Sequence, residues 1–278
     1  MVALPELDVQ SPFGARRSSR LARLIWSICD WRALSAPTRR TLRKRLARRF
    51  AGPFDVIQNG MKLRLYPAEN YCDRTIWARG YLPEPKEHEA LAALVAPDTV
   101  FVDIGANVGT YSAYVGVKSG GTAHILALEP LPRTYRKLLF NLRANDLKTA
   151  ITRQAAVGPT RGKVDLWSDG GSNIGHTSVL KAGTSHAKVS VSADCIPLTE
   201  LVAEAGFKRI DILKIDIEGF EDQAFMPFFR AAPEELWPRH ILIETVHAHL
   251  WTEDVTGFLR NAGYKVTFET PENLILRR

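Results

Sequence analysis

The chain from residue 100 onward alternates short apolar runs with amphipathic stretches. The strand-like runs cover 100–105, 124–128, 151–157, 210–217, 240–245, 264–269 and 273–276, and the run at 100–105 is a short apolar one. Short apolar runs of this kind are typical of strands buried on both faces of a sheet. Helical periodicity fills the intervals at 110–118, 132–145, 198–205, 220–229 and 252–262. This alternation predicts an α/β fold around a mainly parallel sheet of seven strands.

Two parts of the chain depart from this rhythm. Residues 158–196 contain two strand-like runs around a Gly- and Ser-rich loop, which predicts a small β-rich insertion. Residues 54–66 read as two strands around Asn59-Gly60, a dipeptide that favours a hairpin because both residues tolerate positive φ. A helix is expected over 85–96.

We therefore expect three segments. Residues 1–50 form a basic helical N-terminal arm, 51–97 a hairpin with a cap helix, and 98–278 a ligand-binding domain that carries the insertion.

Positive charge is concentrated in the arm. Residues 1–50 hold 12 Lys and Arg against 3 Asp and Glu, whereas the other 228 residues hold 25 against 27. Residues 21–34 place apolar side chains at helical spacing between Arg clusters, which predicts a basic amphipathic helix. Such a helix packs on the body, lies on an anionic membrane surface, docks on an acidic partner or contacts nucleic acid. The near-neutral body argues against nucleic acid as a partner of the domain.

The composition excludes several classes of protein. With 45% hydrophobic and 24% charged residues, the chain is not disordered as a whole. Its three cysteines, Cys29, Cys72 and Cys195, form no CxxC pair, so neither a zinc ribbon nor a dense disulfide framework is expected. No apolar run approaches the length of a transmembrane helix. We expect a cytoplasmic protein, peripheral at a membrane if the arm binds one.

The segment 103–109 (DIGANVG) joins a predicted buried strand to a helix. Gly105 and Gly109 permit a tight turn and the close approach of a ligand, and the helix N-terminus that follows offers unpaired N–H groups. Asp103 can accept from an ammonium group or organise the loop. Polar residues stand where a dinucleotide-binding loop has its second and third glycines, and the Walker A sequence is absent. A ligand with a ribose but no pyrophosphate therefore suits the loop better.

Acidic residues end two of the predicted strands. Glu129 follows the second strand, where a carboxylate can accept hydrogen bonds from both hydroxyls of a ribose. On a strand over 210–217, alternation would place Lys214, Asp216 and Glu218 on one face. Buried charges need partners, so this set is either a structural ion network or a site at the carboxyl edge of the sheet.

Three motifs, VFVDIGANVGTYS, LALEP and LKIDIEGFE, resemble the FkbM family of S-adenosylmethionine-dependent methyltransferases over about residues 80–276. The resemblance implies a class I methyltransferase, Rossmann-like fold with strand order 3-2-1-4-5-7-6 and an antiparallel last strand. It also implies S-adenosyl-L-methionine as cofactor and O-methylation of a hydroxyl on a sugar, glycan or small metabolite. The implied cofactor-binding residues are Asp103, Gly105, Asn107, Gly109, Glu129, Ala156 and Val157.

Methyl transfer to a hydroxyl needs alignment and gains from a general base. The resemblance places Asp216 and Glu218 at the reacting end, and we expect one of them to be the base, with His247 as competitor. These three residues form a carboxylate and imidazole set, but no spacing motif supports a metal site and none is expected. The family often has an acidic residue directly after the Tyr of a Gly-Tyr pair. Here Leu82-Pro83-Glu84 follows Tyr81, so no acceptor-side carboxylate is assigned.

Acceptor specificity is expected outside the core sheet. Asn173 and His176 in the loop 170–178 have polar tips suited to sugar hydroxyls, and Trp77 could stack on a sugar face. The plainer interpretations are a hairpin tip and a packed aromatic ring.

Two other classes of function stay open. A nucleic-acid methyltransferase is supported by the basic arm alone, because residues 216–219 (DIEG) replace the Asn/Asp-Pro-Pro-aromatic motif common in base methylation. A non-enzymatic membrane-associated protein would use the arm as its functional part.

Overall fold

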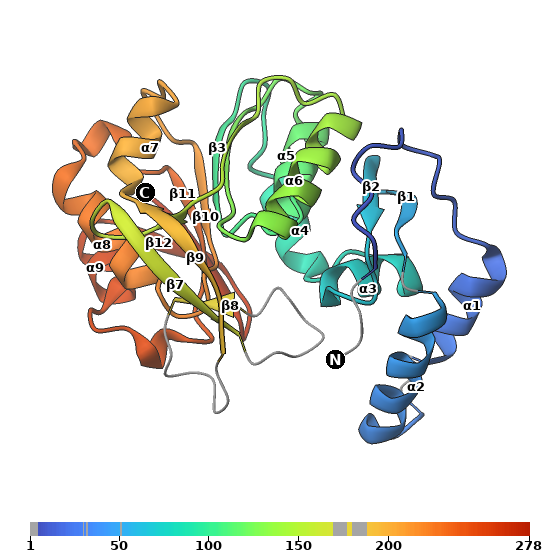
Figure 1. The fold of residues 1–278 in the computed structure, drawn as a ribbon. Helices are drawn as coiled ribbons and strands as arrows, with labels where there is room; N and C mark the ends of the chain where they lie inside the picture. Colours follow the sequence, from blue (N-terminus) through green and yellow to red (C-terminus); the bar gives the residue numbers. More distant parts are fainter. Residues whose placement is uncertain (1–4, 30, 32, 51, 169–176, 180–187) are drawn as a thin grey trace.

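The centre of the molecule is a seven-stranded mixed sheet (Figure 1). The structure is a computed structural model that describes residues 5–29, 31, 33–50, 52–168, 177–179 and 188–278. The sheet has the order β12-β13-β11-β10-β3-β4-β5. Its strands are β3 (Val100–Ile104), β4 (His124–Leu128), β5 (Ile151–Arg153), β10 (Ile212–Ile215), β11 (His240–Glu244), β12 (Lys265–Glu269) and β13 (Asn273–Arg277).

The directions of these strands match the predicted α/β class. Strands β5, β4, β3, β10 and β11 run parallel, and β13 is antiparallel to both β11 and β12. Numbered along the chain, the observed order is 3-2-1-4-5-7-6. The carboxyl ends of the parallel strands therefore share one edge, where open α/β sheets bind ligands.

Helices cover both faces of the sheet. One face is covered by α5 (Thr110–Lys118) and α6 (Pro132–Ala144), and the other by α7 (Leu198–Glu204), α8 (Glu221–Ala231) and α9 (Val255–Asn261) (Figure 1). Along β3 the side chains alternate, because Phe101 belongs to the hydrophobic cluster with α5 and α6, and Val102 and Ile104 to the cluster with α7, α8 and α9. This explains why β3 is apolar at nearly every position. Short 3₁₀ turns lie at Glu234–Leu236 and Ala248–Leu250.

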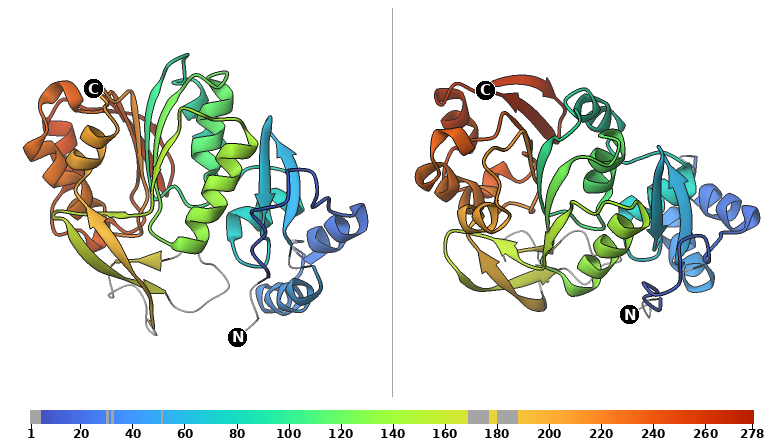
Figure 2. Two further views of the ribbon diagram at one scale, coloured as in Figure 1. Left: turned by 45° about the horizontal axis from the view of Figure 1, so that its top comes forward. Right: turned by 90° about the horizontal axis from the view of Figure 1, so that it is seen from above.

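The described residues that precede β3 lie on the α5 and α6 side of the main sheet (Figure 2). They form α1 (Arg20–Cys29), α2 (Ala36–Arg49), β1 (Phe54–Gln58), β2 (Met61–Leu65), α3 (Tyr71–Arg79) and α4 (Pro85–Ala92). The hairpin predicted around Asn59-Gly60 is confirmed, with φ of 50° and 82° at the two turn residues. Trp26 of α1, Leu63 of β2 and Phe101 of β3 belong to one hydrophobic cluster. The three expected segments thus share a core.

The predicted strand over 151–157 is wrong as a single element. It divides into β5 and β6 (Ala156–Val157), and β6 pairs with β9 in a separate sheet of order β6-β9-β7-β8. The other strands of that sheet are β7 (Gly162–Ser168), β8 (Thr177–Ser178) and β9 (Lys188–Ile196). The insertion is β-rich, as predicted, and β6 joins it to the edge of the main sheet.

The predicted strand over 210–217 is too long. β10 ends at Ile215, so Asp216 and Glu218 lie in the turn beyond it, and Glu218 has a left-handed φ of 58°. The two carboxylates are therefore not placed by strand alternation. Among the described residues, no helix is long and apolar enough to cross a membrane.

Candidate active site

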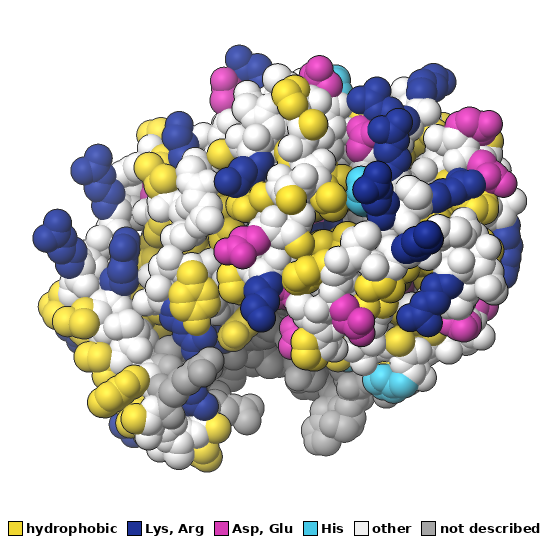
Figure 3. Space-filling model, turned by 180° about the vertical axis from the view of Figure 1, so that it is seen from behind, with side chains coloured by type: hydrophobic (Ala, Val, Ile, Leu, Met, Phe, Trp, Pro, Cys, Tyr) yellow, Lys and Arg dark blue, Asp and Glu magenta, His cyan; other side chains and the backbone are white. Residues whose placement is uncertain are grey.

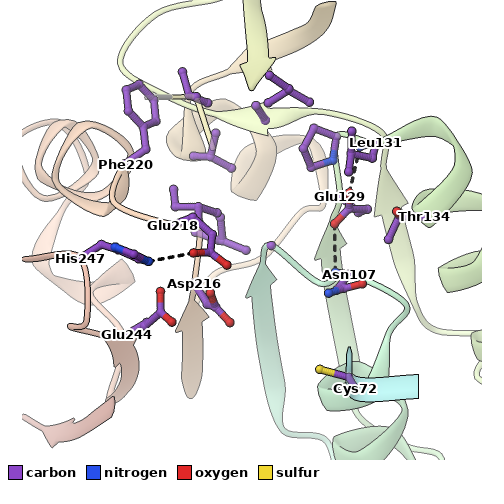
Figure 4. Close-up of a pocket in the computed structure, with 18 of the residues that line it drawn as sticks. Cys72, Asn107, Glu129, Leu131, Thr134, Asp216, Glu218, Phe220, Glu244 and His247 are labelled. Atoms are coloured by element: carbon purple, nitrogen blue, oxygen red, sulfur yellow. Dashed lines mark hydrogen bonds and ion pairs between the residues drawn. The ribbon is translucent and has the colours of Figure 1, made fainter. Parts of the chain in front are cut away.

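A pocket of about 330 Å³ opens at the carboxyl edge of the main sheet, next to the insertion (Figure 4). Its apolar part is lined by Leu131, Ala155, Ala156, Val157 and Leu166. Its polar part carries Glu129, Asp216, Glu218, Glu244 and His247. An apolar cavity with a few convergent polar groups is typical of a small-molecule site.

Gly105 shapes the floor of the pocket where β3 turns into the loop. Its φ is 75°, and a Cβ there would lie 2.0 Å from the carbonyl oxygen of Asp216. Its N–H donates to the carbonyl of Leu128 at 3.0 Å. Glycine is therefore required by the contact between the loop after β3 and the turn after β10, whether or not a ligand also approaches closely.

Asn107 and Glu129 connect the loop to the end of β4. The backbone N–H of Asn107 donates to Glu129 Oε2 at 3.0 Å, and that of Leu131 donates to Oε1 at 2.9 Å. Burial raises the pKa of Glu129 to about 7, although these two hydrogen bonds lower it. Each carboxylate oxygen keeps a second lone pair, so Glu129 can still accept from a ligand hydroxyl.

Asp103 and Gly109 lie behind the pocket and do not line it. Asp103 is fully buried and accepts from Ser112 Oγ at 2.6 Å, so it holds the start of α5. A Cβ on Gly109 would lie 2.6 Å from Leu138 Cδ1 of α6. Both residues therefore support the loop from beneath.

Lys214 is the buried cation of the site. Its Nζ lies 3.2 Å from Asp216 Oδ2 and 3.9 Å from Asp103 Oδ1. Burial lowers its pKa, but Asp216, Asp103 and Glu84 outweigh burial and raise it. Lys214 therefore stays charged and links the base of the loop to the polar end of the pocket.

Glu218, Glu244 and His247 converge at the polar end (Figure 4). His247 Nε2 lies 2.9 Å from Glu218 Oε2. One ligand atom from each of the three residues lies within 4.8 Å of the others, so the set could hold a metal ion. Burial, followed by the charges of Asp216, Glu218 and Glu221, raises the pKa of Glu244 well above its ordinary range. At neutral pH its carboxyl is protonated and can donate a hydrogen bond.

Sequence reasoning missed several pocket residues. Glu84 lines the pocket from a left-handed position before α4, and its Oε2 accepts from Tyr111 Oη at 2.6 Å. Asn70 caps α3 and donates to Asn107 Oδ1 at 2.9 Å. Burial raises the pKa of the Cys72 thiol, so this pocket residue stays protonated. Glu244 had a usable signal, because it ends a buried strand at the same edge as Asp216.

The three expected acceptor residues have different outcomes. The prediction for Trp77 is wrong, because its side chain is 1% exposed and stacks on Phe54 with ring centroids 4.6 Å apart. Trp77 belongs to α3, and its ring is covered by other parts of the protein. Asn173 and His176 lie outside the described residues.

A glycine loop after one parallel strand, with a carboxylate after the next, is the arrangement of Rossmann-like nucleoside-binding folds. The family model described as "Methyltransferase FkbM domain" matches residues 103–266. The chain therefore belongs to the FkbM methyltransferase family and is a transferase of the EC 2.1.1 type.

Curated relatives agree with this assignment. The chain is 28% identical over 200 residues to "Methyltransferase sdnD" of Sordaria araneosa, covering 62% of this chain and 75% of that protein. It is 26% identical over 166 residues to "Hexuronic acid methyltransferase AglP" of Haloferax volcanii, covering 59% of this chain and 63% of that protein. A solved structure of a methyltransferase FkbM from Methylobacillus flagellatus has a TM-score of 0.47 and 17% identity, covering 75% of this chain and just over half, 55%, of that one.

Proposed function

We propose that the protein uses S-adenosyl-L-methionine to methylate a hydroxyl group of a sugar, glycan or small metabolite. The observation that carries the proposal is that one pocket brings Glu129, at the nucleoside end, together with Asp216, Glu218 and His247. A methyltransferase must bind its cofactor and align an acceptor in the same cavity, and this pocket holds residues suited to both tasks.

The chemistry of the pocket residues fits the cofactor. Glu129 offers carboxylate oxygens to ribose hydroxyls, and Ala156 and Val157 offer an apolar surface to an adenine ring. The negative carboxylate of Asp216, which also lines the pocket, favours the positively charged part of the cofactor. When bound, the cofactor supplies an activated methyl group on a positively charged sulfur.

The pair Glu218–His247 supplies the general base in this proposal. Glu218 orients the imidazole through the 2.9 Å contact with Nε2, which leaves Nδ1 as the acceptor of a proton. When the acceptor oxygen takes up the methyl group, His247 would accept the proton that the hydroxyl loses. The neutral carboxyl of Glu244 limits the negative charge gathered beside this pair.

The charge of the pocket favours a neutral acceptor. Six carboxyl groups line it, from Glu84, Glu129, Asp216, Glu218, Glu244 and Glu272, and all of them except the protonated Glu244 can carry negative charge. An anionic acceptor would meet like charge at the polar end, which costs binding free energy. A relative acts on hexuronic acid, but this pocket supports a neutral sugar or alcohol instead.

Labelled methyl transfer tests the proposal. The protein, incubated with cofactor carrying a labelled methyl group, should transfer label to neutral glycosides or alcohols in preference to matched uronic acids. Transfer confined to RNA or DNA, or none to any hydroxyl compound, would contradict it.

Two variants test the base. His247→Gln should lower kcat by about a hundredfold or more and leave the affinity for S-adenosylhomocysteine unchanged. Glu200→Gln is the matched control, because Glu200 pairs with Arg161 on the surface away from the pocket. Equal kcat values for both variants would remove His247 from the reaction.

A further inference from the structure

The helix α1 is apolar on two opposite faces. Its inner face carries Ala22, Trp26 and Cys29, which are all buried. Trp26 packs edge-on against Trp77 with ring centroids 5.5 Å apart, and its Nε1 donates to the carbonyl of Phe50 at 3.3 Å. These contacts fix α1 on the body of the protein, so its outer face has a defined direction.

The outer face of α1 is exposed and hydrophobic. It consists of Leu21, Leu24, Ile28 and the residue just beyond the helix, Trp31, which are 64%, 57%, 51% and 65% exposed. Spacings of three and four positions place Leu21, Leu24 and Ile28 on one side of the helix, and Trp31 follows two residues beyond its end. Half of the eight large exposed hydrophobic residues in the described part of the chain lie in this row. A contiguous exposed row marks an interaction surface, whereas scattered apolar residues do not.

Basic residues lie on α1 itself and on the neighbouring helix α2. Arg20 and Arg23 are exposed on α1. The neighbouring α2 has 14 residues, of which seven are Lys or Arg and none is acidic. Seen from behind, yellow hydrophobic and dark blue basic side chains lie together on the lobe at the lower left, which is the arm (Figure 3).

We propose that the outer face of α1, together with the basic helix α2, docks the protein on an anionic phospholipid surface. Aliphatic side chains and a Trp enter the boundary between headgroups and acyl chains, while long Arg side chains reach the phosphates. Binding to nucleic acid would engage the arginines but leave the apolar row in water. The surplus of nine positive charges in residues 1–50 complements an anionic bilayer, whereas a second copy of this chain offers the arm a body with a surplus of only two negative charges. The docking face lies outside the catalytic pocket, so the two proposals stand separately.

Co-sedimentation of the full chain with lipid vesicles tests the inference. The protein should bind phosphatidylcholine vesicles that contain phosphatidylserine and not vesicles of phosphatidylcholine alone, and added salt should weaken the binding. The double variant Leu24→Asp/Ile28→Asp should bind at least about tenfold more weakly. Brominated lipid should quench the fluorescence of wild type more strongly than that of Trp31→Phe.

Ile57→Asp is the matched control, because Ile57 is 68% exposed on the hairpin and not on the arm. It should bind vesicles like wild type, and thermal melts should show that all variants fold. Failure of wild type to bind anionic vesicles, or equal binding by the double variant, would overturn the proposal. The proposal would also be overturned if the wild type were a dimer and the double variant a monomer, or if the protein bound RNA in a salt-sensitive way and did not bind vesicles. None of these results depends on methyl transfer.

Discussion

The contact between Gly105 and the turn after β10 gives the sharpest prediction. Replacing Gly105 with Ala imposes a left-handed φ of 75° on a residue with a Cβ, and places that Cβ 2.0 Å from the carbonyl oxygen of Asp216. Carbon–oxygen contacts in proteins lie at about 3.3–3.6 Å, so the two segments must separate by more than an ångström. β3 and β10 are paired in register up to Ile104 and Ile215, so this separation strains the ladder.

The expected loss in the free energy of unfolding is the sum of two contributions. The left-handed conformation costs about 1 kcal/mol, and overpacking against backbone adds about 1–3 kcal/mol, so Gly105→Ala should lower the free energy of unfolding by about 2–4 kcal/mol. Gly120 isolates the first part, because its φ is 72° and a Cβ there meets nothing within 4 Å.

Urea denaturation of both variants measures the difference. Gly120→Ala should lose only about 1 kcal/mol and keep its affinity for S-adenosylhomocysteine, whereas Gly105→Ala should lose about tenfold or more of that affinity. Equal unfolding free energies for the two variants would refute the close contact as the reason for this glycine.

Three further predictions follow from the buried groups. Lys214→Met should lower the free energy of unfolding by about 3–5 kcal/mol, because it leaves Asp103 buried without its cation. Lys163→Met, at an exposed ion pair, should lower it by less than about 1 kcal/mol. Similar losses for the two variants would contradict the role of the buried pair. Burial raises the pKa of Glu129 from 4.5 to about 7, so the native state binds the extra proton and stability should fall as pH rises from about 4.5 to 7. Denaturation between pH 4.5 and 7 should show that the unfolding free energy of Glu129→Gln depends less on pH than that of wild type. An equal dependence on pH in both proteins would contradict the raised pKa of Glu129. Trp77→Phe should reduce the free energy of unfolding by about 1–3 kcal/mol and leave the KM for the acceptor unchanged. A raised KM without a loss of stability would instead support a role for Trp77 in acceptor binding.

The elements around the pocket were predictable where local pattern decides structure. The runs at 100–104 and 125–128 are buried on both faces, and such runs form interior strands. Because parallel strands end at one edge, Glu129 and Asp216 were expected to approach the same ligand, and both line the pocket.

The remainder of the site depends on contacts between distant parts of the chain. Glu84 reaches the pocket through a left-handed turn whose position is set by α4 and Tyr111. Trp77 is removed from the pocket by Trp26 and Phe54, which lie far from it in sequence. β10 stops at Ile215, and local propensity does not show that stop. Periodicity carries no information on such packing.

Calorimetric titration of the wild-type protein with S-adenosylhomocysteine tests the central claim most directly. One molecule per chain should bind saturably, and Glu129→Gln should weaken this binding. No heat with this compound, together with saturable binding of NADH in the same pocket, would contradict it.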